Sequence, residues 1–307
     1  MVDPLAEVVT LLQPEAPFSK AVGGAGAWRV RRPEETGQPF YCVILEGSCC
    51  LTVDGHAPMR LDTGDFVLIP SARGFSTSSV DPLAPEGLVT TPVALANGEF
   101  RVGEPSGPPD VRLQIGHCVF GSPDAGLLVS LLPQLVHVRT EPRLATLVSL
   151  VSDESRERRP AREVVLARLL EVLLIEALRS AGTAASPGLV RGLADERLAG
   201  ALRRMHESPT RAWTVAALAK EAALSRSAFF ERFSRAVGVA PMAYLLAWRM
   251  ALAKRLLRHE AGGIAEVAER VGYGSASAFS VAFARHVGVP PARYAKQYVD
   301  AERAHVV

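Results

Sequence analysis

Hydrophobic and polar positions follow two different periods along this chain. From residue 28 to about residue 120 they alternate in short runs separated by Gly, Pro and Asp, which predicts short strands joined by tight turns. After Gly121 the apolar positions recur every three to four residues, which predicts helices over 144–156 and 161–179. From Leu193 onward the pattern predicts helices alone. The sequence therefore predicts a multidomain α+β protein: an N-terminal antiparallel β-barrel, then helices, then a C-terminal all-α domain.

Turn signals place five strands in the first part of the chain. The expected strands cover 39–45, 49–53, 59–61, 66–70 and 111–120. Glu46-Gly47-Ser48 is typical of a tight turn, so we expect the first two strands to pair as a hairpin. Asp54-Gly55 is a second hairpin signal.

Segment 181–192 is rich in Ala, Gly, Ser and Pro and is expected to be an unstructured linker. We therefore expect a β-rich domain over 1–140, a helical connector with linker over 141–192, and a helical domain over 193–307. The apolar stripes of the connector helices suit self-association or packing on the barrel, and both alternatives remain open. A homodimer is the expected assembly.

The helical domain contains an internal repeat. Val215 matches Ile264 and Ala219 matches Ala268, at an offset of 49. Further along the offset is 50, and the matched residues are Phe229 with Phe279, Phe233 with Phe283, Gly238 with Gly288 and Tyr244 with Tyr294. One residue has therefore been inserted at a turn. Each copy has the layout of a helix-turn-helix, with small Ala residues where the two helices cross.

The second helix of such a motif lies in the DNA major groove, braced by the first. Its paired Phe residues, four apart, form the core face, which leaves the opposite face free to contact DNA. In the first copy the candidate DNA-binding residues are Ser225, Arg226, Ser227, Phe230, Glu231, Ser234 and Arg235. In the second copy they are Ser275, Ser277, Ser280, Val281 and Arg285.

The two copies differ in the chemistry of that face. Glu231 is able to accept a hydrogen bond from cytosine N4, and Ser227 at the centre of the same face is able to donate or accept. The second copy offers small side chains. We therefore expect the first copy to discriminate DNA sequence more strongly, and the second to supply phosphate, shape and methyl contacts.

The charge distribution also favours a polyanionic partner. Residues 191–307 contain 18 Lys+Arg and 10 Asp+Glu, a net charge of +8, whereas residues 1–190 have a net charge of −6. Double-stranded DNA is the expected partner. Any single arginine in this region has an alternative role as a solvated surface charge.

These motifs resemble a known family. The Thr214-Val-x-x-Leu-Ala219 start, Ser225-Arg-Ser-x-Phe-x-x-x-Phe233 and Ile264-Ala-Glu-Val-Ala268, with the segment 271–294, resemble the DNA-binding domain of AraC/XylS-type transcription regulators. This resemblance covers about 100 residues. It implies two recognition helices in successive major-groove segments, roughly 34 Å apart. RNA polymerase is a further candidate partner.

The β-rich part resembles cupins, although it departs from the catalytic ones. Gly64-Asp-Phe-Val-Leu-Ile-Pro70, and 116–120 with 127–133, resemble the cupin-type sensor domain found on one branch of these regulators. Catalytic cupins hold a metal through histidines near positions that are here 40–47 and 71–75, and neither segment contains His. His56, His117 and His137 are isolated and are interpreted as structural. We expect no metal, no cofactor and no catalytic residue.

The cysteines are the second kind of candidate chemistry. Cys42, Cys49, Cys50 and Cys118 form no C-x-x-C pair, so zinc is not expected and the thiols are expected to be free. The expected hairpin would place Cys42 opposite Cys49 and Cys50, which makes them candidate redox residues. Buried structural thiols are the alternative.

Three hypotheses for the signal therefore remain open: an oxidant sensed by these cysteines, a small-molecule effector in the barrel mouth, or constitutive DNA binding with a barrel used only for dimerisation.

A membrane location is not expected. The best apolar candidate, 164–178, is interrupted by Arg168, Glu171 and Glu176. The N-terminus lacks the basic flank and apolar core of a secretion signal. We expect a cytoplasmic protein.

Overall fold

The computed structural model describes residues 3–33, 38–70, 74–96, 98–122, 125–156, 159–181, 187–259 and 263–297. The chain forms two compact units. One consists of residues 8–186, and the other of residues 1–7 together with 187–307. The short helix α1 (Pro4–Leu12) contributes residues to both units.

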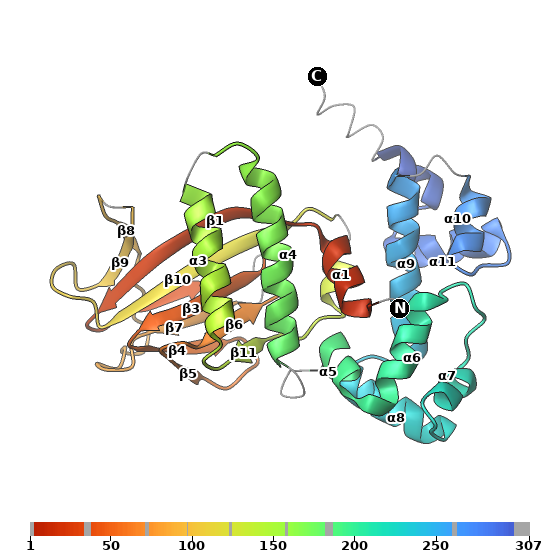
Figure 1. Cartoon of the computed structure of the whole chain (residues 1–307), viewed down its shortest axis with the longest axis horizontal. Helices are drawn as coiled ribbons and strands as arrows, with labels where there is room; N and C mark the ends of the chain where they lie inside the picture. Colours follow the sequence, from red (N-terminus) through yellow and green to blue (C-terminus); the bar gives the residue numbers. More distant parts are fainter. Residues whose placement is uncertain are drawn as a thin grey trace. The chain divides into compact units, whose positions relative to one another are not determined.

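The first unit is built on two facing sheets (Figure 1). The strands are β1 (Pro14–Ala25), β2 (Arg29–Arg32), β3 (Phe40–Glu46), β4 (Ser48–Val53), β5 (Met59–Asp62), β6 (Phe66–Ile69), β7 (Phe75–Ser78), β8 (Val93–Ala94), β9 (Phe100–Gly103), β10 (Val111–Phe120) and β11 (Val136–Val138). Seven of them form a sheet in the order β11-β6-β3-β10-β1-β9-β8, and four form a sheet in the order β2-β7-β4-β5.

This architecture confirms the predicted β-rich domain and refines it. The two sheets face each other as in a jelly roll and are not joined into a closed barrel. Neighbouring strands are antiparallel, but β1 and β9 are parallel, with Val22 beside Phe100.

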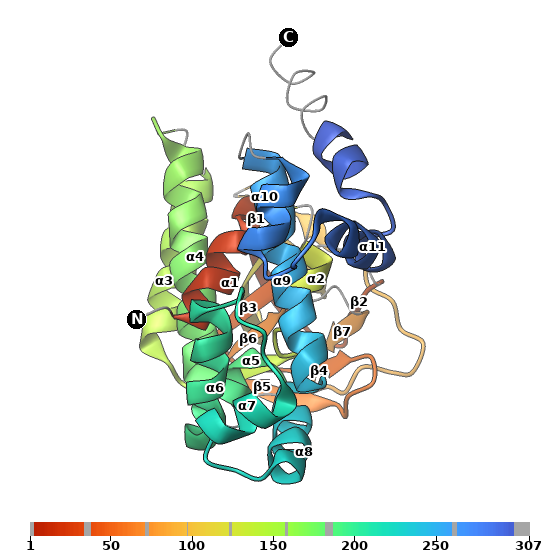
Figure 2. The same ribbon diagram turned by 90° about the vertical axis from the view of Figure 1, so that its right-hand side faces the viewer.

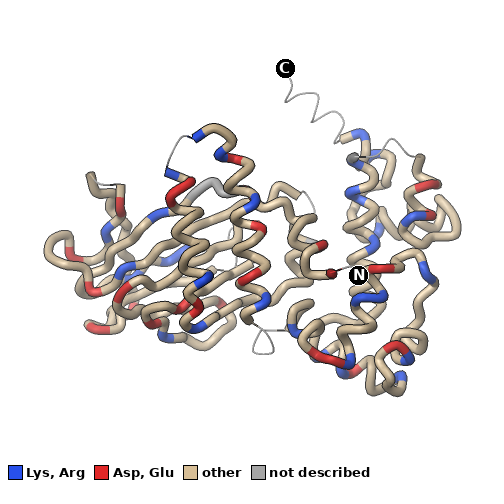
Figure 3. The backbone as a smooth tube through the Cα atoms, viewed as in Figure 1, with Lys and Arg blue, Asp and Glu red and all other residues tan. Residues whose placement is uncertain are grey.

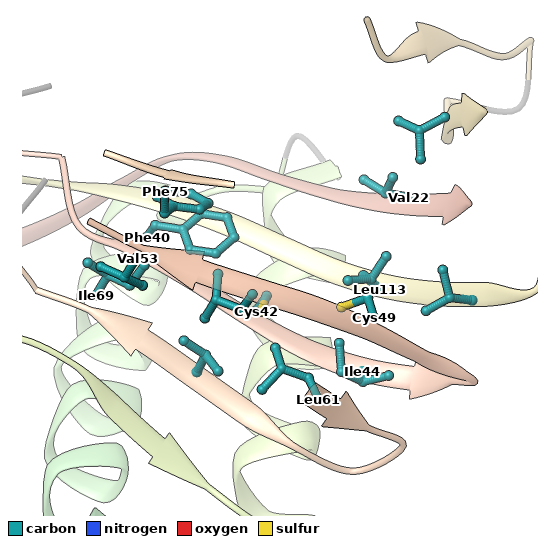
Figure 4. Packing of buried hydrophobic residues seen from close by; sticks show 14 of the residues in the cluster. Val22, Phe40, Cys42, Ile44, Cys49, Val53, Leu61, Ile69, Phe75 and Leu113 are labelled. Atoms are coloured by element: carbon teal, nitrogen blue, oxygen red, sulfur yellow. The ribbon is translucent and has the colours of Figure 1, made fainter. Parts of the chain in front are cut away.

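The core lies between the sheets (Figure 4). Along β4 the side chains alternate between buried and half-buried, so that Cys49, Leu51 and Val53 point into it. In β6 all four residues are buried, as expected for a strand covered on both faces.

One sequence-based expectation about pairing is wrong. β3 and β4 do not form a hairpin, because β3 pairs with β10 and β6 while β4 pairs with β5 and β7. The chain crosses from one sheet to the other at Gly47, whose φ is +75°. A side chain there would collide with the carbonyl oxygen of Asp110, so only glycine fits this crossing. The second hairpin signal is confirmed: β4 and β5 pair, with Cys49 opposite Leu61.

After the short helix α2 (Ala125–Val129), two long helices cover the outer face of the seven-stranded sheet (Figure 1). They are α3 (Pro142–Arg156) and α4 (Arg162–Ala181). A hydrogen bond from Nε2 of Gln114 in β10 to Oγ of Ser152 in α3, 2.8 Å long, fixes one of them to the sheet. Part of each apolar stripe is buried, whereas Leu150, Val164 and Val172 remain exposed. Self-association through these residues stays a prediction.

The second unit is helical. Its helices are α5 (Leu189–Ala194), α6 (Glu196–Glu207), α7 (Val215–Glu221), α8 (Arg226–Val237), α9 (Pro241–His259), α10 (Ile264–Arg270) and α11 (Ala276–Val287), and residues 291–297 are also helical. Figures 1 and 2 agree that α7 and α8 lie at one end of α9, and α10 and α11 at the other.

The expected unstructured linker over 181–192 is wrong where the structure describes it, since Ala181 ends α4 and a helix begins at Leu189. Residues 182–186 lie outside the described residues, and residues 189–194 form α5 with Leu189 and Val190 buried. Gly192 permits this packing, since a Cβ there would lie 2.8 Å from both Leu202 and Val237. Gly192 therefore serves close packing in this helix and does not indicate an unstructured segment.

None of the described helices has, on its own, the length and apolar composition to span a bilayer; α8 and α9 meet that criterion only as a pair bent by 56°.

Candidate nucleic-acid interface

The two helix-turn-helix copies start their second helices in the same way. Oγ of Ser225 accepts a hydrogen bond from the backbone N–H of Ala228 over 3.2 Å, and Oγ of Ser275 does the same for Ala278 over 3.2 Å. Each capping hydroxyl also lies beside the hydroxyl two residues on, Ser227 at 3.4 Å or Ser277 at 3.2 Å. Such caps satisfy backbone donors that have no partner inside the helix.

The turns of the two copies explain the change in offset. Leu224 N–H donates to the carbonyl oxygen of Ala219 over 2.9 Å, and Tyr273 N–H donates to the carbonyl oxygen of Ala268 over 2.8 Å. The residue numbers of these two equivalent hydrogen bonds differ by 49. The caps at 225 and 275 differ by 50. Gly274 is therefore the inserted residue.

The aromatic cores of the copies match in geometry. The rings of Phe229 and Phe233 are 5.5 Å apart, and those of Phe279 and Phe283 are 5.4 Å apart. A tyrosine then meets the second ring edge-on, Tyr244 at 5.8 Å and Tyr294 at 5.5 Å. All four Phe side chains are fully buried. The core faces inferred from the sequence are confirmed, which leaves the opposite faces of α8 and α11 toward solvent.

On α8, six of the seven candidates are exposed: Ser225, Arg226, Ser227, Phe230, Glu231 and Arg235. Phe230 is 45% exposed and places an apolar ring among the polar side chains of this face. Ser234 is half-buried and its hydroxyl oxygen is buried, so it is less suited to contact DNA than the other six.

On α11 the exposed candidates are Ser275, Ser277, Val281 and Arg285. The fifth, Ser280, donates its hydroxyl to the carbonyl oxygen of Ala276 over 2.7 Å and is half-buried. Val281 occupies the position that Glu231 has on α8 and is 70% exposed. The second face is therefore apolar where the first is acidic.

Arg232, which the sequence leaves open between phosphate contact and solvation, has a protein partner. Its Nε lies 2.6 Å from Oδ2 of Asp195, the residue that caps α6. This ion pair fixes α8 to the helix before it. Arg226, Arg235 and Arg285 remain the arginines on the exposed faces, and Lys and Arg recur along α9 (Figure 3).

A buried polar group inside this unit was missed by the sequence analysis. Nδ1 of His206 lies 2.8 Å from Oε2 of Glu7, and its Nε2 lies 2.8 Å from the hydroxyl of Tyr244. Its ring stacks on Trp248 at 4.0 Å. Burial lowers the pKa of His206 despite the nearby carboxylate of Glu7, which favours the neutral ring at pH 7. The carboxylate then accepts from Nδ1–H, and Nε2 accepts from the tyrosine hydroxyl.

The candidate redox residues in the β-rich unit are mostly inaccessible. All four cysteines are free thiols, and Cys42, Cys49 and Cys118 are buried. Cys42 and Cys49 come from opposite sheets into one core (Figure 4). Burial raises the pKa of Cys42 to about 12 and also raises the pKa of Cys49 and of Cys118. The reactive form of cysteine is the thiolate, so this burial disfavours oxidation. Cys50 is half-exposed.

The histidines of this unit have separate surroundings. Nε2 of His137 lies 3.0 Å from Oδ2 of Asp65, and the ring of His117 packs beside Phe40 at 5.3 Å. Within the described residues, no three His, Cys, Asp or Glu side chains come together in a way that would hold a metal ion.

Comparison with known proteins gives two family matches. Residues 3–182 match the family model described as a cupin, and residues 218–297 match one described as a helix-turn-helix domain. A "Putative AraC-like transcription regulator" of Streptomyces lividans is 37% identical over 96% of this chain and 98% of its own length. The transcriptional regulator AlkR of Acinetobacter baylyi is 29% identical over 83% of this chain and 87% of its own length. Among solved structures, the DNA-binding domain of AdpA in complex with a target DNA is 34% identical, covers 34% of this chain and 94% of that domain, and has a TM-score of 0.33.

Proposed function

This chain belongs to the AraC family of DNA-binding transcription regulators, and from that premise we propose that α8 and α11 read two successive major-groove segments of one duplex. One observation supports this above the others. The same cap, aromatic core and outward face occur twice in one compact unit, at both ends of α9. The exposed faces of α8 and α11 are therefore suited to contact the major groove of one duplex in two successive turns.

The exposed side chains divide into two roles under this proposal. Arg226, Arg235 and Arg285 contact phosphates, which sets affinity and register without reading sequence. Ser227 and Glu231 contact base edges, with the carboxylate accepting from cytosine N4. Val281 lies against a thymine methyl group, the contact available to an apolar side chain in the major groove.

We further propose that a signal received in the β-rich unit controls DNA affinity. An effector changes DNA affinity only if it binds two arrangements of the chain with different affinity. Three of the four thiols are buried, so the unit is better suited to bind a small molecule than to react with an oxidant.

The test of the DNA proposal uses the full chain. Preferred duplexes are selected from a random pool, and affinity is then measured by fluorescence anisotropy on the selected site and on versions with either half altered. We expect two adjacent half-sites about one helical turn apart. Glu231→Ala should reduce discrimination at one base pair by about 1–3 kcal/mol. Glu196→Ala, which alters an exposed glutamate on α6, is the matched control. Selection of a single half-site, or equal effects of the two variants, would contradict the proposal.

A further inference from the structure

An aromatic ring on α8 lies outside the core that the rest of the helix builds. Phe229 and Phe233, four residues apart, are fully buried and fill the core face. A helix turns by about 100° per residue, so the side chain of Phe230 leaves the helix about 100° away from that of Phe229. Nearly half of its surface is open to solvent. Single exposed apolar side chains are common, so the position of this ring is more informative than its exposure.

Phe230 borders the centre of the exposed face. Ser227 lies three residues before it and Ser234 four residues after it, which places all three on one flank of the helix. Ser227 is exposed, as is Glu231, whereas the hydroxyl oxygen of Ser234 is buried. On the opposite flank Arg232 is held by Asp195. The side chains able to reach a ligand on the first flank are therefore one hydroxyl and one aromatic ring, next to a carboxylate.

The second copy has a different arrangement at the same positions. Ser280 is equivalent to Phe230, and its hydroxyl is already bonded to the carbonyl oxygen of Ala276. Val281 is equivalent to Glu231 and is 70% exposed. Each recognition helix thus offers one exposed apolar side chain, but at a different position. The apolar side chain of α8 consequently has its own target and does not repeat the contact proposed for Val281.

The major groove presents one apolar group to such a ring. Its base edges carry hydrogen-bond donors and acceptors, and the exception is the methyl group on C5 of thymine. Burying a ring against a donor or acceptor leaves that group without a partner and costs free energy, whereas burying it against a methyl group is favourable. Apolar side chains that insert between base pairs as wedges do so from the minor groove, which is not the groove proposed for α8.

We propose that Phe230 is a specificity-determining residue, and that its ring packs on the 5-methyl group of a pyrimidine in the half-site contacted by α8. This inference rests on the proposed function, since it requires α8 to lie in the major groove. Adjacent residues have Cα atoms about 3.8 Å apart, and successive bases of one strand rise by about 3.4 Å. The methyl group therefore belongs to the base pair contacted by Glu231 or to a neighbouring one. Thymine carries this methyl group, and 5-methylcytosine carries it at the same carbon.

The first experiment removes the methyl group and leaves every hydrogen-bonding group of the base in place. Each thymine of the α8 half-site in the selected duplex is replaced in turn by uracil, and anisotropy measures the affinity of the full chain. We expect one replacement to weaken binding by about fourfold, the loss that corresponds to one buried methyl group. A selected α8 half-site without thymine, or replacements that all change affinity by less than about 1.5-fold, would overturn the inference.

A second pair of bases tests the methyl group without thymine. At the sensitive position, thymine with its paired adenine is replaced by cytosine or by 5-methylcytosine, each paired with guanine. We expect 5-methylcytosine to bind about fourfold more tightly than cytosine, since the two differ only in the methyl group. Equal affinity for cytosine and 5-methylcytosine would show that the methyl group is not contacted.

Variants of the protein assign the methyl contact to Phe230. Phe230→Ala and Phe230→Gln should each bind the thymine and uracil duplexes with affinities that agree within about 1.5-fold. This ratio is insensitive to a structural defect that weakens binding to both duplexes equally, and thermal unfolding checks the fold of each variant. Met242→Ala, which removes an apolar side chain 37% exposed on α9, is the matched control and should keep the fourfold ratio. A fourfold ratio that survives in both Phe230 variants would overturn the assignment.

The inference and the proposed function fail in different ways. A chain that selects two half-sites and loses discrimination with Glu231→Ala, but is indifferent to every uracil in the α8 half-site, would contradict the role of Phe230 alone. A chain that selects no paired half-sites would overturn both. Uracil in the α11 half-site supplies an internal control, because a methyl contact of Val281 should be equally sensitive in the wild type and in Phe230→Ala.

Discussion

Arg249 donates a hydrogen bond from Nε to the carbonyl oxygen of Pro209 over 2.7 Å, and this contact links the two helix-turn-helix copies. Pro209 lies in the loop that leads to α7 of the first copy, whereas Arg249 lies on α9. A second bond, from Nη2 to the carbonyl oxygen of Arg211, is 2.8 Å long. Gly272, in the turn of the second copy, lies against the same guanidinium. One side chain thus holds a loop of the first copy and a turn of the second.

Replacing Arg249 should uncouple the two recognition helices. Lys keeps the charge but cannot reproduce the fixed geometry of two guanidinium bonds, so Arg249→Lys should loosen the placement of α8 relative to α11. We expect affinity for a complete DNA site to fall by about tenfold, with affinity for a single half-site changing by less than about threefold. Anisotropy on both duplexes measures this. Arg255→Lys, an exposed position on the same helix, is the control, and equal losses on both duplexes would argue against a linking role.

The turn of the second copy should depend on the absence of a side chain at Gly272. Its φ is +83°, and a Cβ would lie 2.8 Å from Nη2 of Arg249 and 2.9 Å from the carbonyl oxygen of Pro209. Gly272→Ala should therefore lower the free energy of unfolding by about 1–3 kcal/mol, measured by urea denaturation. Gly274→Ala is the control, since a Cβ at Gly274 meets nothing within 4 Å. Similar losses for both variants would contradict this account.

Thiol reactivity should separate Cys50 from the other three cysteines. Cys50 is half-exposed, whereas burial raises the pKa of Cys42, Cys49 and Cys118. In the native protein we expect an aromatic disulfide reagent to label one thiol rapidly and the rest only on unfolding. Cys50→Ser should remove the rapid phase. If Cys42→Ser removed it instead, buried thiols would be reactive and the redox hypothesis would regain support.

The stability of the β-rich unit should decrease in mild acid because of His117. Its pKa is lowered from 6.5 to about 4, mainly by burial and then by Arg32 and Lys20. Between these two values the unfolded chain binds a proton that the folded chain does not. The contribution of His117 to stability is thus present above pH 6.5 and is lost as the pH falls toward 4. Unfolding temperatures at pH 7.5 and 5 should differ less for His117→Asn than for the wild type; an equal difference would exclude this histidine as the cause.

The strands and helices that the sequence predicted correctly are those whose periodicity is regular. The alternation in β4 and the apolar spacing in α4 are examples. The long strand β1 was missed because Pro14, Pro17, Gly23 and Gly24 interrupt its alternation. The pairing error at Gly47 has a different cause, since a tight turn gives no sign of whether the chain stays in one sheet or crosses to the other.

The candidate interface was more predictable than the contacts that support it. The repeat shows from sequence alone that Phe229 and Phe279 face inward, and this defines the outward faces. By contrast, the partners of Arg249 and His206 lie 38 to 199 residues away along the chain, and no local pattern connects them. A pocket between the two sheets of the β-rich unit likewise combines residues of six different strands, so only the folded chain reveals it.

The two recognition helices should differ in how much sequence they read. On α11 the Ser280 hydroxyl already donates to Ala276, and the position equivalent to Glu231 is Val281. The double variant Ser277→Ala with Ser280→Ala should therefore change discrimination among altered second half-sites by less than about threefold, since discrimination needs well-placed polar partners.

Val281→Glu should create a preference worth about 1–3 kcal/mol at one base pair of the same half-site, because it supplies the acceptor that α8 already has. Both are measured by anisotropy on a panel of duplexes, with salt concentration held constant because phosphate contacts depend strongly on it. A large, sequence-specific loss in the double serine variant would mean that α11 reads bases through its hydroxyl groups, and a Val281→Glu variant without any new preference would mean that this position does not reach the base edges.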